Sequence, residues 1–282
     1  MAEAIISKEK VKKTSVILVG IPFDLYSTFM HGPALAPARI REVLHAGATN
    51  LCAENGIDLG ASRALDDRGD IQVDNQSDSD WIRLIEEQMS TLLETQTPVL
   101  TLGGDHAVTY PIIRAYSRKY TALTILQLDA HPDLYDHYEG NRFAHACPFA
   151  RIMEEKLVGR LIQVGIRTLN PHQQEQAQRF GVEVIEMRHF APDLLPRIDT
   201  PVYVSIDLDV LDPAYAPGVS HHEPGGMSTR QVIEIIHRIE APIVGADIVE
   251  YNPKRDPTET TAMVAVKLLK EITARMIEQA ER

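Results

Sequence analysis

The sequence is poor in the residues that mark secreted, membrane-spanning or nucleic-acid-binding proteins. Its 282 residues include only two cysteines and one tryptophan, and no apolar stretch approaches the roughly 18 residues that a membrane-spanning helix needs. Two cysteines, Cys52 and Cys147, are too few for a disulfide framework and form no C-x-x-C pair. We therefore expect two reduced thiols in a cytoplasmic protein, and no secretory signal before the short apolar run at 15–21.

Positive charge is also scarce. The 40 acidic residues outnumber the 28 basic ones, for a formal net charge of −12. A short basic run, "KEKVKK" at 8–13, lies in an N-terminal segment, 1–13, that we expect to be a flexible arm. An acidic chain without a dense Lys/Arg block is poorly suited to phosphate backbones, so we expect neither a nucleic acid nor a membrane as partner. Such a charge is compatible with a small cationic substrate.

Apolar runs alternate regularly with amphipathic stretches along the chain. Strands are predicted at 15–21, 97–103, 122–130, 161–167, 182–186, 202–209 and 242–250. Helices are predicted at 36–46, 79–95, 106–118, 144–156, 171–180, 228–239 and 258–280. Strands that are apolar throughout and separated by helices indicate a mainly parallel sheet covered on both faces. We predict one α/β domain over 1–282, with three α/β/α layers and a doubly wound sheet.

Carboxylates and imidazoles follow several of these strands, at the point where each strand ends. The candidate metal ligands are His106, Asp129, His131, Asp133, Asp207 and Asp209. Because the carboxyl ends of parallel strands share one edge of the sheet, we expect these side chains to meet in one cleft. So many buried carboxylates repel one another unless a cation lies among them. Since Asp129, His131 and Asp133 alternate along the chain, we expect them to face one side of a strand end.

The chemistry of this set indicates a pair of manganese ions. It has two imidazoles, four carboxylates and no sulfur, and such donors suit Mn²⁺ better than a structural zinc ion. Six residues are more than one first-row ion needs, and they match a pair of ions about 3.5–4 Å apart, as in two-metal hydrolytic sites. We therefore expect two Mn²⁺ ions per subunit. Asp105, before His106, is expected to cap a helix or to support a ligand.

Three ordered motifs resemble the signatures of the ureohydrolase family, which includes arginases, agmatinases, guanidinobutyrases and formiminoglutamases. They are "GGDH" (103–106), "DAHPD" (129–133) and "SIDLDVLDP" (205–213), and the resemblance covers roughly residues 15 to 275. Further stretches are similar to plant-type arginases in particular. These are "GPALAPARIRE" (32–42), "YEGNRFAHACPFARIME" (138–154), "APGVSHHEPGG" (216–226) and "GADIVEYNPKRD" (245–256).

The resemblance implies an arginase/deacetylase-like fold, two Mn²⁺ ions and hydrolysis of a guanidino group to urea plus an amine by a metal-bridging hydroxide. It also implies a homo-oligomer, a trimer or hexamer. Glu250 matches the acidic residue that pairs with the substrate guanidinium, as a carboxylate can do bidentately. His145 matches the proton shuttle toward the leaving amine, and Asp133 is expected to take part in that proton transfer.

Two loops depart from animal arginases and from many agmatinases, and both departures agree with the plant-type pattern. The catalytic histidine stands in "AHA" instead of preceding glycine, and the loop after the third motif reads "GVSHHEPGG". For the tail of the substrate, Asn141 and His221 are the candidate contacts.

The leading substrate is L-arginine, giving urea and ornithine, in arginine or polyamine metabolism. Agmatine follows closely, because the two activities share every catalytic residue, and 4-guanidinobutyrate comes third. Two other classes stay open: a deacetylase-like amidohydrolase with a single zinc ion, and a binding subunit that has kept the fold without catalysis. Metal content and urea release distinguish all of these.

Overall fold

One parallel sheet runs through the described part of the chain. The computed structural model describes residues 15–62, 64–73 and 80–282, so the predicted arm lies outside it. The strands are β1 (Val16–Gly20), β2 (Leu65–Asp70), β3 (Val99–Leu102), β4 (Thr124–Leu128), β5 (Arg160–Ile166), β6 (Glu183–Glu186), β7 (Val202–Asp207) and β8 (Ile243–Val249). Their order is β2-β1-β3-β8-β7-β4-β5-β6, and every pairing is parallel.

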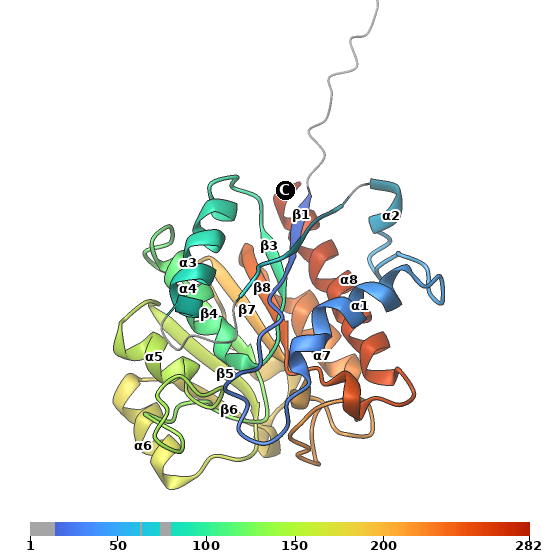
Figure 1. Ribbon diagram of the computed structural model, residues 1–282. Coiled ribbons are helices and arrows are strands. Elements are labelled where there is room, and N and C mark those ends of the chain that lie inside the picture. Colours follow the sequence, from blue (N-terminus) through green and yellow to red (C-terminus); the bar gives the residue numbers. More distant parts are fainter. Residues whose placement is uncertain (1–14, 63, 74–79) are drawn as a thin grey trace, which may run out of the picture.

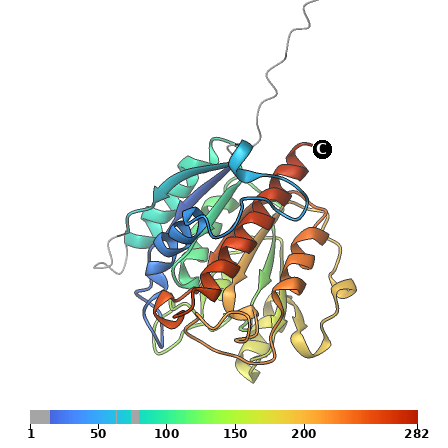
Figure 2. The same cartoon turned by 90° about the vertical axis from the view of Figure 1, so that its right-hand side faces the viewer.

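Helices cover both faces of the sheet (Figures 1 and 2). One face carries α1 (Ala36–His45), α7 (Thr229–Arg238) and α8 (Thr260–Ala280). The other carries α3 (Asp80–Leu93), α4 (Thr109–Ser117), α5 (Pro148–Glu154) and α6 (Pro171–Phe180). This arrangement confirms the predicted three-layer α/β/α fold.

The inner strands of the sheet are largely apolar because both of their faces are buried. In β1, Val16 and Leu18 pack in the core on the side of α1, α7 and α8, while Ile17 and Val19 pack in the core on the opposite side. All four side chains are at most 2% exposed. Burial of one such side chain stabilises the fold by about 1.5–3 kcal/mol, and the same alternation holds in β4 and β7.

Two parts of the fold differ from the sequence prediction. Strand β2, "LDDRGD", was missed because it carries no apolar alternation. It is an edge strand whose acidic side chains are held from α1, where Arg41 donates to Asp67 (2.9 Å) and Asp70 (2.5 Å). The helix predicted over 144–156 begins only at Pro148, and the proline stands at its first position. His145 therefore lies in a loop.

The order of the strands creates a central crevice. β3 and β4 are consecutive in sequence, yet β8 and β7 lie between them in the sheet. Ligand sites of open α/β sheets lie outside the carboxyl ends of the strands where the order reverses. The motifs at 103–106, 129–133 and 205–213 all follow or end these central strands. Among the described residues, no helix has the length and apolar character needed to cross a bilayer.

Candidate metal centre and substrate pocket

His106 is surrounded by three carboxylates from other strand ends. It is fully buried at the start of η2 (His106–Val108), directly after β3. Its Nδ1 lies 3.1 Å from Asp129 Oδ2, 3.1 Å from Asp133 Oδ2 and 3.2 Å from Asp207 Oδ2. The ends of β3, β4 and β7 therefore converge on one point, as the sequence predicted.

A second group shares one residue with the first. His131 Nδ1 lies 2.8 Å from Asp209 Oδ2 and 3.6 Å from Asp129 Oδ1. Asp129 therefore presents one oxygen to each group. In each of the sets His106–Asp129–Asp133 and Asp129–His131–Asp209, the donor atoms lie within 4.8 Å of one another, close enough to hold an ion. With Asp207 beside His106, the structure brings all six predicted ligands together.

The "DAHPD" segment is a loop, whereas the sequence predicted the end of a strand. β4 ends before Asp129, and Asp133 has a left-handed φ of 49°, which a residue with a side chain adopts at a cost. The loop folds around its own carboxylates. His131 N–H donates to Asp129 Oδ1 (2.6 Å), and Ala130 N–H donates to Asp209 Oδ1 (3.1 Å). Because acid and imidazole alternate in this loop, its side chains contribute to both ligand groups.

The "GGDH" turn depends on a close backbone approach. A Cβ at Gly104 would lie 1.7 Å from the carbonyl oxygen of Phe23, so only glycine fits there. The same carbonyl accepts a hydrogen bond from Asp105 N–H (2.8 Å). Asp105 in turn caps η2, accepting from Ala107 N–H (3.1 Å), as predicted. These contacts fix the position from which His106 enters the cleft.

A buried chain of hydrogen bonds sets the orientation of His106. Its Nε2 lies 2.9 Å from Ser205 Oγ, which donates to Asp247 Oδ1 at 2.7 Å. Asp247 also accepts from the hydroxyls of Thr109 (2.9 Å) and Tyr203 (2.8 Å). Since the Ser205 proton is directed to Asp247, its oxygen accepts from His106 Nε2–H. Nδ1 is therefore the atom turned toward the carboxylates, as in a metal ligand held by a hydrogen-bonded partner.

The two ligand groups lack compensating positive charge. Burial and the neighbouring Asp209 raise the pKa of Asp207 well above its ordinary value. Burial and Asp129 raise the pKa of Asp133 to about 6. Burial disfavours the imidazolium form of His106, but its carboxylate neighbours outweigh burial and raise the pKa of this histidine as well. Each raised pKa means that the cluster favours the protonated form of the group, and so favours added positive charge.

The donor chemistry fits a pair of divalent metal ions. Nδ1 of His106 is buried without a hydrogen-bond partner while it faces three carboxylate oxygens. Within the described residues, the ion pairs of these carboxylates are all with His106 or His131. Oxygen-rich donors with imidazole match Mn²⁺ and similar ions, and the shared carboxylate of Asp129 matches the bridging position of a two-metal site.

Glu250 and His145 form a buried pair beside the ligand groups. Glu250 Oε1 lies 2.7 Å from His145 Nδ1 and accepts from His106 N–H at 2.9 Å. Burial alone would raise the pKa of Glu250, but His145 and the His106 N–H outweigh burial and lower it. Burial disfavours a charged His145, but Glu250 outweighs it and raises its pKa to about 9. Glu250 is thus an ionised carboxylate in a buried place, suited to a cation.

The backbone at Glu250 has an unfavourable conformation. Its φ is 64°, in the left-handed region, and its N–H donates to the carbonyl of Gly104 at 2.9 Å. A residue with a side chain adopts this region at a cost on the order of 1–3 kcal/mol, and such residues cluster at functional sites. The turn after β8 thereby aims the carboxylate at His145 and the cleft.

A cavity of about 200 Å³ opens beside these groups. Its lining includes the metal candidates His131, Asp133, Asp207 and Asp209, together with His145 and Glu250. The rest of the lining consists of Thr28, Tyr135, Tyr138, Ala146, Thr168, Gln173 and His221. Four of the six predicted ligands therefore line the same cavity as His145 and Glu250, and its remaining wall is mostly polar.

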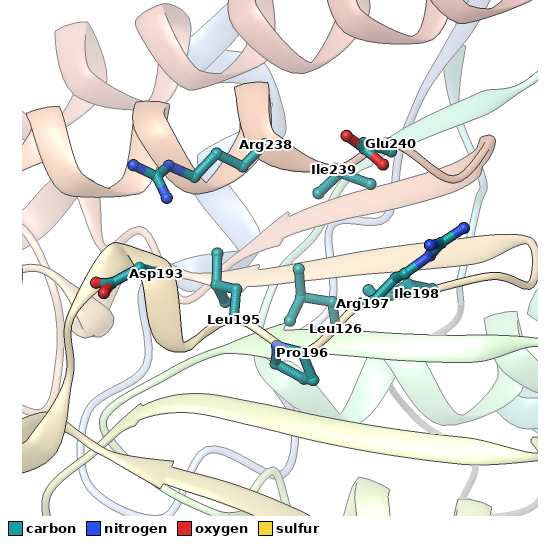
Figure 3. A pocket seen from close by; sticks show the side chains of 9 residues that line it. All are labelled: Leu126, Asp193, Leu195, Pro196, Arg197, Ile198, Arg238, Ile239 and Glu240. Carbon is teal, nitrogen blue, oxygen red and sulfur yellow. The ribbon is translucent and has the colours of Figure 1, made fainter.

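A larger cavity, of about 340 Å³, lies between α7 and the segment before β7 (Figure 3). Its floor is apolar, with Leu126 from β4 and Ile239 after α7, and its edge carries Asp193, Arg197 and Arg238. It contains no histidine and none of the predicted ligands. Size alone therefore does not mark the chemical site, and we place the site in the smaller cavity.

The structure places the two candidate tail contacts differently. Asn141 and Tyr138 exchange two backbone hydrogen bonds of 2.9 Å, and Asn141 Oδ1 accepts from Phe143 N–H (2.8 Å). Asn141 thus supports a tight turn, while Tyr138 lines the cavity.

His221 faces the cavity directly. Its ring centre lies 5.3 Å from that of His145 and 6.0 Å from that of His131. Burial, together with the neighbouring His145, lowers the pKa of His221. A neutral imidazole at this position can serve as a hydrogen-bonding group for a ligand.

Several residues of the site could not be found from the sequence. Thr28, Tyr135, Tyr138 and Gln173 line the cavity, and Ser205 orients His106. Hydroxyl and amide side chains of this kind are common on any surface, so their type carries no signal. Ser205 offered one hint, because it stands two residues before a ligand on the same strand and so shares its face.

Comparison with known proteins agrees with this geometry. A sequence model of the arginase family matches residues 14–274. The chain is 47% identical over 281 residues to "Arginase 1, mitochondrial" of Arabidopsis thaliana, covering 94% of this chain and 82% of that protein. It is 34% identical over 276 residues to an agmatinase of Bacillus subtilis, covering 95% and 94%. The solved arginase of Medicago truncatula superposes with a TM-score of 0.88 at 41% identity, covering 94% and 88%.

The prediction of a cytoplasmic protein is wrong by the same comparison. The matched arginases of Arabidopsis thaliana and Oryza sativa are named as mitochondrial or chloroplastic proteins. The two cysteines misled the prediction, because reduced thiols are equally compatible with such compartments. The family resemblance of the strand-end motifs and the predicted α/β/α fold are both confirmed, and this chain belongs to the arginase family.

Proposed function

We propose that this chain is a binuclear metal-dependent ureohydrolase that cleaves L-arginine to urea and ornithine. One observation carries the proposal: two ligand groups that share Asp129 open into the same cavity as an ionised Glu250 paired with His145. The 47% identity to a plant arginase supports arginine as the substrate. Mn²⁺ is the proposed metal, held by His106, Asp129, His131, Asp133, Asp207 and Asp209.

Glu250 is proposed to bind the substrate guanidinium. Both of its side-chain hydrogen bonds within the described residues use Oε1, so Oε2 is available to accept an N–H bond from a planar guanidinium. Such a contact presents the guanidinium carbon to the ligand groups. Bound metal supplies a nucleophile derived from water near neutral pH.

His145 and Asp133 are proposed to handle protons during collapse of the tetrahedral adduct. Both line the cavity, and an imidazole moves protons readily near neutral pH. His145 would pass a proton toward the leaving amine, so that ornithine departs neutral at that nitrogen. Asp133, in the ligand group with His106 and Asp129, would hold a proton during this step.

The tail of the substrate is proposed to contact His221 and the turn at Tyr138 that Asn141 supports. The protein is proposed to act on a small guanidino compound as a homo-oligomer, a trimer or hexamer. Neither nucleic acid nor a membrane is expected as a partner.

Agmatine is a second candidate substrate, and one observation favours it. Of the residues that the structure describes, those lining the cavity include no lysine or arginine that could pair with the α-carboxylate of arginine. Agmatine lacks that carboxylate and needs no such partner. Arginine remains the first choice because polar groups such as Tyr138 can bind a carboxylate by hydrogen bonds.

The test is release of urea by purified protein loaded with Mn²⁺. Arginine, agmatine and 4-guanidinobutyrate are compared by kcat/KM under identical conditions. A preference for arginine supports the proposal, and a preference for agmatine retains the mechanism with a different substrate. Absence of urea from all three, with two manganese ions bound per subunit, would refute it.

A further inference from the structure

The loop after β1 reaches across the cavity to the far side of His145. Thr28 N lies 3.2 Å from His145 Nε2, and Thr28 Oγ1 lies 2.8 Å from the same nitrogen. His145 N–H in turn donates to the carbonyl of Tyr26 (3.4 Å). The imidazole is therefore held on one edge by Glu250 and on the other by Thr28, 117 residues away in sequence.

The two contacts from Thr28 define which ring nitrogen carries the proton. A backbone N–H can only donate, so the nitrogen that it faces presents a lone pair. The proton of the neutral ring is then on Nδ1, where it donates to Glu250. The hydroxyl of Thr28 is adaptable: it donates to Nε2 of the neutral ring and accepts from Nε2–H of the charged ring.

We propose that Thr28 is a positioning residue that holds the His145 imidazole with its proton on Nδ1 and its Nε2 free to receive one. This inference rests on the proposed role of His145 as the group that moves a proton to the leaving amine. Glu250 alone fixes one point of the ring. A second hydrogen bond, at Nε2, opposes rotation about the side-chain torsions and a flip of the ring that would exchange Nδ1 and Nε2.

The rest of the loop is built to hold Thr28 in place. Asp24 accepts from Gly32 N–H (2.6 Å), which closes the base of the loop. The hydroxyl of Ser220 donates to the carbonyl of Met30 (3.1 Å) and ties the loop to the opposite lip of the cavity. These contacts hold Thr28 at the mouth of the cavity, so its pairing with His145 is part of a fixed architecture.

The test uses Mn²⁺-loaded full-length protein and the variant Thr28→Val, which keeps the shape and the backbone N–H but removes the hydroxyl. Loss of one such hydrogen bond predicts a fall in kcat of about fivefold, with KM changed less than about twofold. Thr28→Ser restores kcat because it returns the hydroxyl. Thr91→Val is the matched control, since Thr91 donates to the carbonyl of Glu87 on the exposed side of α3.

A double-mutant cycle separates positioning from general support of the loop. In a His145→Asn background, Thr28→Val is expected to lower the residual kcat no further. An equal loss in both backgrounds, or no loss in the parent, overturns the inference. A wild-type kcat in His145→Asn alone also overturns it.

A second readout does not depend on activity. At a pH above the raised pKa of about 9, where the His145 ring is neutral, nitrogen-15 chemical shifts are expected to report a proton on Nδ1 in both proteins. The Nε2 signal of Thr28→Val is expected to be displaced from that of the parent, because this nitrogen has lost the hydrogen bond from the hydroxyl. Identical shifts in the two proteins overturn the inference. If the parent releases no urea from any guanidino compound, the proposed function fails, and these shifts still decide the role of Thr28.

Discussion

Two clusters of buried acid among the described residues differ in the basic side chains that pair with them. The ion-pair cluster lies between α7, α8 and the loop around Glu54. There, the carboxylate of Glu271 is fully buried and contacts Lys267 (2.5 Å) and His237 (2.8 Å), while Glu54 pairs with Arg230 (2.7 Å). The metal-type cluster holds Asp129, Asp133, Asp207 and Asp209, whose ion pairs among the described residues are all with imidazoles.

The difference shows how an acidic residue that stabilises the fold can be distinguished from one that binds metal. Buried charge is costly unless it is paired, and the ion-pair cluster is paired by the chain itself. The metal-type cluster leaves its carboxylates to an external cation. Acid without nearby lysine or arginine is therefore the feature that carries function here, and each prediction below changes the charge in one of the two clusters.

The largest effect is expected from Asp129→Ala. This change removes the one carboxylate that serves both ligand groups, so we expect loss of bound metal and a fall in kcat/KM of about a thousandfold or more. Metal analysis and urea release measure both. Asp199→Ala is the control, because Asp199 is an exposed partner of Arg197. Two bound ions with full activity in Asp129→Ala would contradict the assignment.

The second effect is the opposite pH dependence of metal-free and metal-loaded protein. In the metal-free protein, the raised pKa of Asp133, about 6 against 3.8, makes its ionisation unfavourable. Stability is therefore lost as the pH rises from about 4 through 6. Bound metal needs the ionised form, so loaded protein gains stability over the same window.

Thermal unfolding of chelated and Mn²⁺-loaded samples between about pH 5 and 7.5 tests this. The Tm of the chelated sample should fall as the pH rises over this range. The Tm of the loaded sample should rise over the same range. Parallel curves would mean that the carboxylates are not the groups that bind metal.

A smaller effect is expected from Lys267→Met in the ion-pair cluster. The change leaves the buried carboxylate of Glu271 with His237 as its remaining side-chain partner. We expect a loss of about 1–3 kcal/mol in the free energy of unfolding. Metal content and kcat should stay at the parental values, since the cluster does not touch the cavity. Arg282→Met at the exposed end of the chain is the control, and a loss of metal in Lys267→Met would remove the distinction between the clusters.

The smallest effect is expected from Glu54→Gln. Arg230 lowers the pKa of Glu54 to about 2 from 4.5, with Lys267 adding to the effect. A lowered pKa contributes stability above pH 4.5 that is lost as the pH falls toward 2. The pair is partly exposed, so the difference between parent and variant should be below about 1 kcal/mol at neutral pH. Chemical denaturation at neutral and acidic pH measures it, and a difference that grows on acidification would contradict the pairing.

The sequence allowed a prediction wherever a local pattern of residues is compatible with few structures. Strands buried on both faces must be apolar, so seven of the strands and the layered fold could be predicted. The meeting of the six candidate ligands in one place could be predicted because acid and imidazole at strand ends have little structural use. Edge strand β2 escaped because its pairing depends on Arg41 of a distant helix, which a local pattern cannot record.

The remaining parts of the site depend on contacts between distant segments. Thr28 meets His145 across 117 residues, and Ser205 meets Asp247 across 42. Neither hydroxyl is distinguished by its neighbours in sequence. The start of α5 was placed too early because the loop before Pro148 contains ordinary helix-forming residues.

The shared carboxylate of Asp129 also governs how the protein would fill with metal. Its two oxygens point into different groups, so an ion in one group orients the carboxylate for the other, while its charge repels a second cation nearby. By linkage, each ion changes the affinity for its partner by the same factor. The two groups therefore do not fill independently, and titration with metal measures the sign and size of their coupling.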